Sequence, residues 1–312
     1  MRNLITRALC WLVVVFVVAC GGASKIVGPD ITPTPASSPT PTPEPYAHFV
    51  FTADVGECGS PAVPKTAGLA KDRPDATIGI AGDLAYPNGR AVDFKNCLEP
   101  WYGIKEIKDR TRPVPGNHEY DQLGALPFFD FYGSLAGPRG LGYYEYYVGS
   151  VFVLALNSNR APMGSSQWNA QLDWMKAIIS ANPAKCQIAY FHHPLFSAGK
   201  YGGNNQSVVF EEILYSAGFD IIINGHDHIY NRRAPQLPNG NIDIVNGTRH
   251  FIVGTGGGGL YKCEQEQVAS ERCLDLYHGI LDVKVYWGSN RYTWQFVDTE
   301  NIVRDSGEGQ CH

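Results

Sequence analysis

Five apolar segments of this chain each run into a short polar sequence that contains Gly, Asp, Asn or His. The polar sequences are Asp54–Gly56, Gly82–Tyr86, Gly116–Glu119, His192–Pro194 and Gly225–His228. In open α/β sheets, ligands bind beyond the carboxyl ends of the strands. We therefore expect these polar residues, which lie far apart in the sequence, to converge on one site.

The apolar segments have strand length and are rich in β-branched and aromatic residues. Six apolar runs along the chain have these features, namely residues 48–53, 76–81, 151–156, 187–191, 220–223 and 250–253. Their apolar character is nearly continuous, which predicts strands that are covered on both faces.

Helical spacing appears between some of these segments, at Trp168, Leu172, Met175 and Ile179. This spacing predicts a helix with Ser165 or Ser166 as its N-cap. Residues 208–217 predict a second helix, which Gly218 ends.

Two antiparallel hairpins are also predicted, one from residues 281–286 and 291–297 and one from residues 143–148 and 151–156. The fold class is therefore α/β, with mixed sheets that carry antiparallel additions. We expect one domain over residues 46–312, without an internal linker or repeat.

The composition excludes a wholly disordered or fibrous chain, because 44% of the 312 residues are hydrophobic and 18% are charged. The formal net charge is -5. A dedicated nucleic-acid-binding protein usually has a clear basic excess, so we expect no nucleic-acid partner.

The N-terminus predicts an export signal. Arg2 and Arg7 precede an apolar run, residues 8–19, and this run is too short to span a bilayer. The end of this run, Val17-Val18-Ala19-Cys20-Gly21, resembles a bacterial lipobox. Residues 1–19 are then a signal peptide and Cys20 is lipidated, with ordinary cleavage elsewhere as the alternative. We expect an exported protein at the cell envelope or surface, which contacts the membrane through its lipid anchor only.

Residues 20–45 are rich in Pro, Thr and Ser, and seven prolines lie in this stretch. Proline fixes φ and removes a backbone donor, so the stretch predicts a semi-rigid spacer between anchor and domain.

Six cysteines lie beyond the spacer, and an even number in an exported domain predicts three disulfides. Six cysteines allow 15 pairings. Among these we favour Cys58–Cys97, Cys263–Cys273 and Cys186–Cys311. None of the six has a C-x-x-C spacing, so a thiolate zinc site is not expected.

The residues expected to converge are two Asp, an Asn, up to four His and a Tyr. Oxygen and imidazole donors without thiolates suit first-row metals such as Zn, Fe or Mn. The donors outnumber what one ion needs. Two ions that share a bridging carboxylate fit the number, and paired ions serve phosphoryl hydrolysis.

In order, the motifs D-x-G, G-D-x-x-Y, G-N-H-E, H-x-P and G-H-x-H resemble the calcineurin-like metallophosphoesterase superfamily. Tyr86, and the lack of a histidine in Asp54–Gly56, resemble its purple acid phosphatase branch. The resemblance covers residues 49–232. It implies a metallophosphoesterase-type β-sandwich of mixed sheets flanked by helices, with a two-metal site at the carboxyl ends of the strands.

Residue by residue, the resemblance implies seven metal ligands and one catalytic histidine. The first metal would be held by Asp54, Tyr86 and His228, the second by Asn117, His192 and His226, and both by the bridging Asp83. His118 would face the substrate, where it would stabilise charge or protonate the leaving group.

Several assignments stay open at this stage. His192 is favoured over His193 as the ligand, which leaves His193 for a contact with substrate or with a ligand. Tyr120 either lines the pocket or packs in the core. His226 and His228 face one site only if the backbone turns between them, and Gly225 permits such a turn.

Residues outside the motifs receive structural interpretations. The remaining histidines in the domain are expected to be structural or exposed, namely His48, His250, His278 and His312. Residues 254–259 are rich in glycine but lack the lysine of a P-loop, so they predict a tight loop near the metal centre.

The resemblance implies hydrolysis of small phosphate esters by a metal-activated hydroxide at a binuclear centre, as in an acid phosphatase. The cofactors would be two metal ions, Fe3+ with Fe2+, Zn2+ or Mn2+. One alternative is a phosphodiesterase or nucleotidase with the same centre. Another is a surface lipoprotein that binds a ligand without catalysis. The natural substrate and the oligomeric state are left open.

Overall fold

The structure is a computed structural model that describes residue 16, residues 44–265 and residues 267–312. The predicted signal peptide and Cys20 lie outside the described residues, except for Phe16, and so does most of the spacer. The chain divides into two compact units, Met1–Thr42 and Pro43–His312, and only the second is described below. None of the helices in the described residues is long and apolar enough to cross a membrane.

The domain is built on two mixed sheets. The first has six strands in the order β13-β12-β11-β1-β2-β3. These strands are β1 (Tyr46–Thr52), β2 (Thr77–Ala81), β3 (Thr111–Val114), β11 (Gly279–Tyr286), β12 (Arg291–Asp298) and β13 (Val303–Gln310). Strands β1, β2 and β3 are parallel to one another, and β11 to β13 add antiparallel strands at β1.

The second sheet has seven strands in the order β10-β8-β9-β7-β6-β5-β4. These are β4 (Tyr144–Val148), β5 (Val151–Ala155), β6 (Gln187–Tyr190), β7 (Ile221–Asn224), β8 (Tyr230–Arg233), β9 (Arg249–Val253) and β10 (Ser270–Leu274). Strands β5, β6, β7 and β9 are parallel, and β4, β8 and β10 are antiparallel additions. The sequence did not indicate β8 or β10, which are short and carry polar residues.

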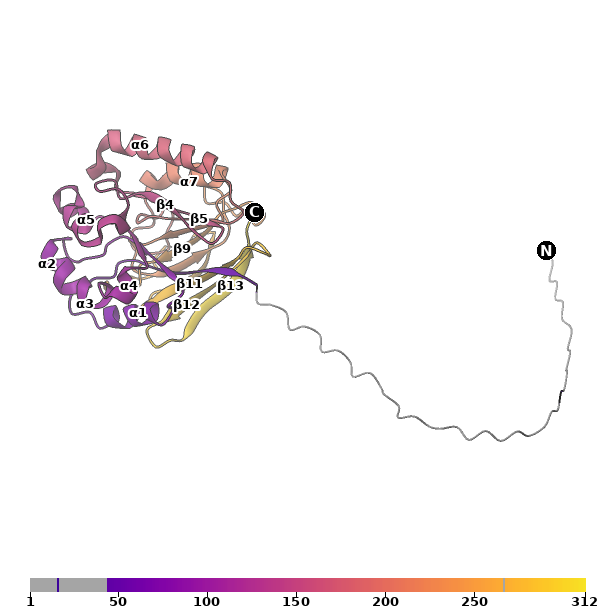
Figure 1. The fold of residues 1–312 in the computed structure, drawn as a ribbon, viewed down its shortest axis with the longest axis horizontal. Helices are drawn as coiled ribbons and strands as arrows, with labels where there is room; N and C mark the ends of the chain where they lie inside the picture. Colours follow the sequence, from indigo (N-terminus) through magenta and orange to yellow (C-terminus); the bar gives the residue numbers. More distant parts are fainter. Residues whose placement is uncertain (1–15, 17–43, 266) are drawn as a thin grey trace. The chain divides into compact units, whose positions relative to one another are not determined.

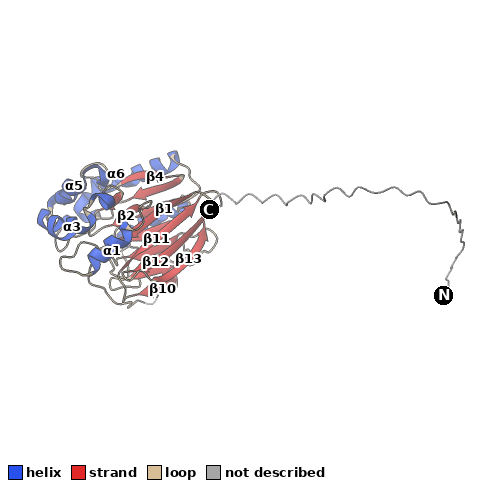
Figure 2. Cartoon of the chain, turned by 60° about the horizontal axis from the view of Figure 1, so that its bottom comes forward, coloured by secondary structure: helices blue, strands red, loops and turns tan. Residues whose placement is uncertain are grey.

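The two sheets pack against each other, and helices cover their outer faces (Figures 1 and 2). The first sheet is covered by α1 (Ala62–Lys71), α2 (Ala91–Asp93), α3 (Glu99–Tyr102), α4 (Lys105–Lys108) and α5 (Leu126–Tyr132). The second is covered by α6 (Arg160–Ala181) and α7 (Val208–Ser216). Short 3-10 or π turns span Phe94–Leu98, Glu119–Asp121, Leu123–Ala125, Gly133–Ala136 and Asn205–Ser207.

Alternate residues of one strand enter different cores. On β1, Phe49 and Phe51 pack between the sheets, whereas Val50 packs against the helices over the first sheet. On β7, Ile223 packs between the sheets and Ile222 packs under α6 and α7. Because both faces of these strands are buried, their sequences are almost continuously apolar, as the sequence predicted.

Both predicted hairpins are confirmed, with β4 paired to β5 and β11 paired to β12. The helix predicted at residues 208–217 is confirmed, and Gly218 follows it with φ of 76°. The helix predicted from Ser165 or Ser166 is confirmed as the main part of α6, which itself begins earlier, at Arg160. Gly164 interrupts it with φ of 76°, so an additional helical turn precedes the amphipathic part.

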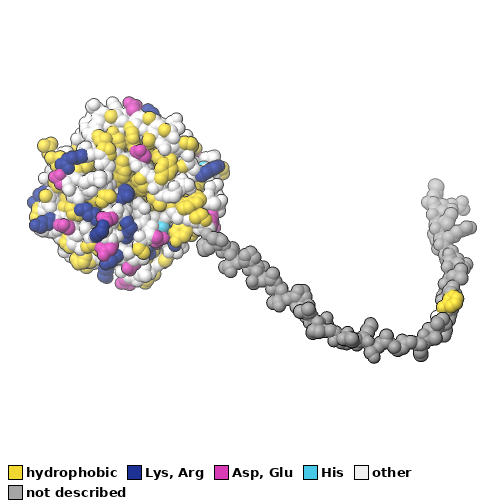
Figure 3. Space-filling model, in the orientation of Figure 1, with side chains coloured by type: hydrophobic (Ala, Val, Ile, Leu, Met, Phe, Trp, Pro, Cys, Tyr) yellow, Lys and Arg dark blue, Asp and Glu magenta, His cyan; other side chains and the backbone are white. Residues whose placement is uncertain are grey.

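The structure contains the three disulfides that the sequence analysis favoured, Cys58–Cys97, Cys186–Cys311 and Cys263–Cys273. Cys186 directly precedes β6 of the second sheet, and Cys311 directly follows β13 of the first sheet. This bridge therefore joins the two sheets at one end of the sandwich. Across the face shown in Figure 3, basic and acidic side chains are mixed in small groups.

A partly buried ion network joins β1 and β11 to Arg73, which lies two residues after α1. The carboxylate of Asp282 on β11 accepts hydrogen bonds from His48 (2.9 Å) and from Arg73. Burial alone raises the pKa of Asp282, but the bonds from His48 and Arg73 outweigh burial and hold the pKa below the ordinary 3.8. The stabilisation is thus present above the ordinary pKa and is lost as the pH falls through the lowered one.

We predict that Asp282→Asn lowers the free energy of unfolding by about 1–3 kcal/mol at pH 7, because a charged acceptor of two bonds is lost. The difference from the wild type should shrink below about pH 4, where the unfolded carboxylate becomes protonated. Urea unfolding at pH 7 and at pH 3 measures both values. A difference that stays constant with pH would contradict the assignment.

Candidate metal centre

Six polar segments follow the carboxyl ends of parallel strands and meet at one edge of the sandwich. In the first sheet, Asp54 follows β1, Asp83 follows β2 and Asn117 follows β3. In the second sheet, Ser158 follows β5, His192 follows β6 and His226 follows β7. The site thus lies where the parallel parts of both sheets end, as the sequence predicted.

Three of these residues have backbones in the left-handed region, with φ of 58° at Asp54, 50° at Asp83 and 72° at His226. Non-glycine residues adopt this conformation at an energetic cost, and such residues are frequent at functional sites. The backbone turn that would let His226 and His228 face one site is present, and it lies at His226, which has the positive φ, rather than at Gly225. Gly225 is needed for a close approach, since a Cβ there would lie 2.7 Å from Asp54 Oδ2.

One cluster of donors surrounds the hydroxyl of Tyr86. This oxygen lies 2.9 Å from Asp54 Oδ1, 3.0 Å from His228 Nε2 and 3.3 Å from Asp83 Oδ2. His228 Nε2 is also 3.3 Å from Asp54 Oδ1. Ligands that bind one ion at about 2.0–2.2 Å are separated by such distances. The first cluster therefore fits one metal ion.

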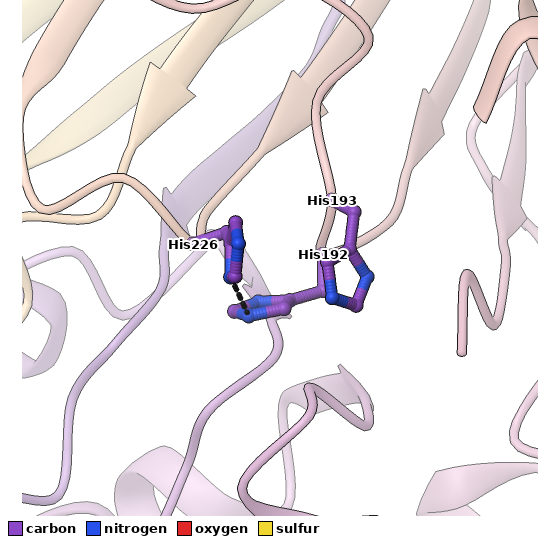
Figure 4. Close-up of side chains that lie close together, drawn as sticks. All are labelled: His192, His193 and His226. Carbon is purple, nitrogen blue, oxygen red and sulfur yellow. Dashed lines mark hydrogen bonds between the residues drawn. The ribbon is translucent and has the colours of Figure 1, made fainter. Parts of the chain in front are cut away.

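A second cluster surrounds Nε2 of His192. This nitrogen lies 3.1 Å from Asn117 Oδ1, 3.2 Å from Asp83 Oδ2 and 3.3 Å from His226 Nδ1. Figure 4 shows the rings of His192, His193 and His226 side by side, with the His192–His226 contact as a dashed line. Asp83 Oδ2 belongs to both clusters, in the position of a bridging carboxylate.

Backbone carbonyls fix the tautomers of two histidines. Nδ1 of His192 donates to the carbonyl of Ala81 at 2.9 Å, and Nδ1 of His228 donates to that of Gly259 at 2.8 Å. In the neutral ring, the lone pair of each of these histidines is therefore on Nε2, which lies among the other donors. Carbonyl partners of this kind orient metal-ligating histidines.

The electrostatics of the second cluster favour a cation. Burial lowers the pKa of His192, but the carboxylates of Asp83 and Asp54 outweigh burial and raise it to about 9. Burial and the neighbouring His192 lower the pKa of His226 to about 4. The donor atoms of the second cluster therefore stabilise a positive charge between them, and a metal ion would supply that charge.

Burial raises the pKa of Tyr86 well above 10, and the carboxylates of Asp54 and Asp83 raise it further. Without a cation the phenol therefore keeps its proton and donates to Asp54 Oδ1. The donor set, a phenol with carboxylate and imidazole, fits a hard first-row ion. Within the described residues, Asp54, Asp83 and His192 also form a group with atoms within 4.8 Å of one another.

A family model described as calcineurin-like phosphoesterase matches residues 47–230. The chain belongs to the calcineurin-like phosphoesterase family. This finding confirms the family resemblance of the five motifs. The family is a class of binuclear metal enzymes. The chain's membership of this family therefore agrees with the two clusters of donors that share Asp83.

Two plant proteins are similar in sequence to this family member. Purple acid phosphatase 15 of Arabidopsis thaliana is 26% identical over 244 residues, which cover 66% of this chain and 43% of that protein. Purple acid phosphatase 18 of the same plant is 26% identical over 253 residues, which cover 72% and 54%. The chain thus spans about half the length of these relatives.

Two solved structures share the fold. The purple acid phosphatase PPD1 from yellow lupin seeds has a TM-score of 0.70 at 19% identity, over 87% of this chain and 55% of that one. GAP50, the anchor in the inner membrane complex of Plasmodium, has a TM-score of 0.66 at 15% identity, over 86% and 89%. The predicted fold class, a sandwich of mixed sheets flanked by helices, is confirmed.

The structure places His118 beside the centre, as the family motif implies. Its Nδ1 contacts the carbonyl of Pro87, and its Nε2 lies 3.7 Å from Asp83 Oδ2. A carbonyl only accepts hydrogen bonds, so Nδ1 carries a proton and Nε2 faces the site. The side chain remains 32% exposed, which leaves it accessible to a substrate.

His193 and Tyr120, whose roles the sequence left open, both lie beside the second cluster. His193 is buried and its Nδ1 lies 2.9 Å from Ser158 Oγ, so only its other nitrogen can face the site. Tyr120 packs partly in the core, and its hydroxyl accepts a hydrogen bond from Asn157 at 2.7 Å. Both of the alternatives stated for Tyr120 therefore hold, because it also lines a cavity beside Asn117.

The remaining histidines have structural partners. His48 contacts Asp75 and Asp282, His250 lies near Glu211, His278 contacts the carbonyl of Gly258 and His312 contacts Asp220. The glycine-rich loop after β9 lies at the centre, since a Cβ on Gly258 would lie 2.7 Å from the ring of His228. Its predicted place near the metal centre is confirmed.

The sequence analysis missed an aromatic wall beside the centre. Tyr201 stacks on His226 with ring centroids 4.7 Å apart, and Tyr261 stacks on His228 at 4.3 Å. The two tyrosines meet edge to face at 5.7 Å. No local sequence signal marked them, because Tyr201 and Tyr261 both lie outside the helices and strands.

Glu119, the last residue of the G-N-H-E motif, received no role from the sequence. Its buried carboxylate accepts hydrogen bonds from the amides of Leu84 (2.8 Å), Ala85 (3.2 Å) and Gly116 (2.8 Å). It therefore joins the loop after β2 to the loop after β3. Burial, and then the charge of Asp83, raises its pKa to about 7.

We predict that Glu119→Ala weakens metal binding by about 10–100-fold, as expected when a group that supports the ligands is removed. It should also lower the free energy of unfolding by about 3 kcal/mol, because three buried amides lose their acceptor. Metal titration monitored by mass spectrometry and urea unfolding measure these effects.

Glu145→Ala, at an exposed position on β4, is the matched control and should change neither quantity. Glu119→Gln keeps one acceptor oxygen and should be intermediate. Wild-type metal affinity in Glu119→Ala would contradict the positioning role.

Proposed function

We propose that this protein hydrolyses phosphate monoesters at a binuclear metal centre, as an acid phosphatase does. The observation that carries the proposal is the position of Asp83 Oδ2, which lies 3.3 Å from the hydroxyl of Tyr86 and 3.2 Å from Nε2 of His192. One carboxylate oxygen thus joins two clusters of ligand type. Family membership supports a small phosphate-ester substrate.

Each ion would have its own donors and share one carboxylate. Asp54, Tyr86 and His228 would hold the first ion, Asn117, His192 and His226 would hold the second, and Asp83 would bridge them. When bound, such ions orient phosphate oxygens and make hydroxide available near neutral pH. The phenol of Tyr86 favours a trivalent ion at the first position, so we propose Fe3+ with Fe2+, Zn2+ or Mn2+.

His118 would act on the substrate. Its Nδ1 proton is held by the carbonyl of Pro87, which orients the ring. Its Nε2 faces the site and lies beyond hydrogen-bond distance of Asp83, so it is free to contact another group. A proton held at this Nε2 would be donated to the leaving oxygen as the ester bond breaks.

We also propose that the protein is exported and held at the cell envelope by lipidated Cys20. The apolar run before Cys20 and the lipobox-like sequence support this proposal. The three disulfides are consistent with it, since disulfides persist in oxidising compartments.

The direct test measures metal content, visible absorption and hydrolysis of p-nitrophenyl phosphate beside its bis ester. We expect two metal ions per chain and faster hydrolysis of the monoester. Asp83→Asn should lose metal and lower kcat by about 1,000-fold, because several kcal/mol of transition-state stabilisation are removed. Tyr86→Phe should remove any visible band that arises from a phenolate bound to iron.

Tyr147→Phe is the control, because Tyr147 is an exposed tyrosine on β4 that bonds to Asn182. It should keep both the metal and the activity. Faster cleavage of the bis ester would favour the phosphodiesterase alternative. Metal-loaded protein that cleaves neither ester would favour a ligand-binding role, and Asp83→Asn that loses metal yet keeps full activity would overturn the two-metal mechanism.

A further inference from the structure

A cavity of about 320 Å³ adjoins the second cluster of metal donors. Its polar lining consists of Asn117, Tyr120, Asp121, Asn159, His193 and Gln206. Asn117 is a proposed metal ligand, so an ester bound at the centre has this cavity beside it. The size lies at the lower end of the range for small-molecule sites.

The hydrogen bonds of Ser158 determine the tautomer of His193. Ser158 Oγ accepts a bond from the backbone N–H of His193 at 3.0 Å and lies 2.9 Å from Nδ1 of the same residue. Ser158 is fully buried, so its own hydrogen needs an acceptor. Among the described residues, Nδ1 of His193 is the recorded partner for that hydrogen. Nδ1 therefore accepts, and Nε2 carries the proton.

Two other groups that line the cavity have a hydrogen-bond donor or acceptor without a partner in the described residues. Both amide hydrogens of Asn159 are used, by the carbonyl of Pro115 and by Asn157, so its Oδ1 remains an acceptor. The hydroxyl oxygen of Tyr120 accepts from Asn157, which leaves its hydrogen to donate.

Two further groups complete the lining. The side chain of Gln206 has no recorded partner in the described part of the chain, so it offers both a donor and an acceptor. Asp121 is bonded to Asn88 at 3.0 Å and contributes a negative charge. The lining residues include no Lys or Arg. Mixed donors and acceptors suit hydroxyl groups, and the carboxylate disfavours a second anion.

We propose that this cavity binds the alcohol portion of the phosphate ester. The preferred alcohol is uncharged and bears several hydroxyl groups. His193 donates a hydrogen bond from Nε2 to the bound ester. Ser158 is the positioning residue that holds His193 in this tautomer. The proposal rests on the proposed phosphate-ester hydrolysis and names the substrate class for it.

The first experiment compares glycerol 3-phosphate with propyl phosphate, which has the same chain length without the free hydroxyls. We expect kcat/KM of the wild type to favour glycerol 3-phosphate by about 10-fold or more, because a site built to bond hydroxyls rejects an analogue without them. Gln206→Leu should reduce this ratio by about 3–10-fold. Gln295→Leu, at an exposed position on β12, is the matched control and should leave the ratio unchanged.

The second experiment tests the tautomer in the zinc-loaded full chain. Nitrogen NMR of 15N-histidine-labelled protein should show His193 with a protonated Nε2 and an accepting Nδ1. Ser158→Ala should shift that signal and raise KM for glycerol 3-phosphate, whereas Ser158→Thr keeps the hydroxyl and should restore both. His193→Gln places an amide donor near the position of Nε2 and should retain more activity than His193→Phe.

The outcomes separate the two proposals. If the metal-loaded wild type does not hydrolyse p-nitrophenyl phosphate, both the proposed function and this inference are overturned. Activity on p-nitrophenyl phosphate with equal kcat/KM for glycerol 3-phosphate and propyl phosphate would overturn the inference alone. A preference for an ester with a second phosphate, or a His193 signal with protonated Nδ1, would also overturn it.

Discussion

Buried negative charge at the edge of the two sheets is the constraint on which the site depends. Asp54 is fully buried and Asp83 is 2% exposed, and histidines and a phenol contact their carboxylates. Burying carboxylates without a compensating positive charge is costly. The pKa of His192 rises for this reason. A pair of metal ions would satisfy both carboxylates at once, and the clustered lone pairs of the neighbouring side chains would become ligands.

The support for this arrangement comes from backbone groups of both sheets. Carbonyls of Ala81 and Gly259 orient two of the histidines, and the carboxylate of Glu119 binds the loops after β2 and β3 together. Because these partners come from different segments of the chain, displacement of one loop would disturb several donors. The close contacts of Gly116 and Gly225 with the aspartates leave no room for a larger residue there. The positions of the donors are thus fixed by contacts within the protein.

Side chains other than the metal donors also surround the centre. Tyr201 and Tyr261 cover the histidines on one side, and the Cys263–Cys273 disulfide begins two residues after Tyr261. On another side, His193 lines a polar cavity, and Ser158 contacts its Nδ1. Family membership fixes the chemistry of the metal donors, whereas groups like these decide which ester is bound, since specificity depends on contacts with the leaving group.

The sequence by itself determined the strand-end motifs and the α/β class, whereas it left 15 pairings of the six cysteines, of which the structure contains the set that we favoured. Apolar runs and turn residues are local signals, and each parallel strand delivers its motif to the same edge. Only the tertiary structure decided which atoms meet. It showed that His226, rather than Gly225, turns the chain, that Glu119 joins two loops and that Ser158 sets the tautomer of His193. These contacts join residues from different strands, and periodicity along one segment carries no information about a partner on another.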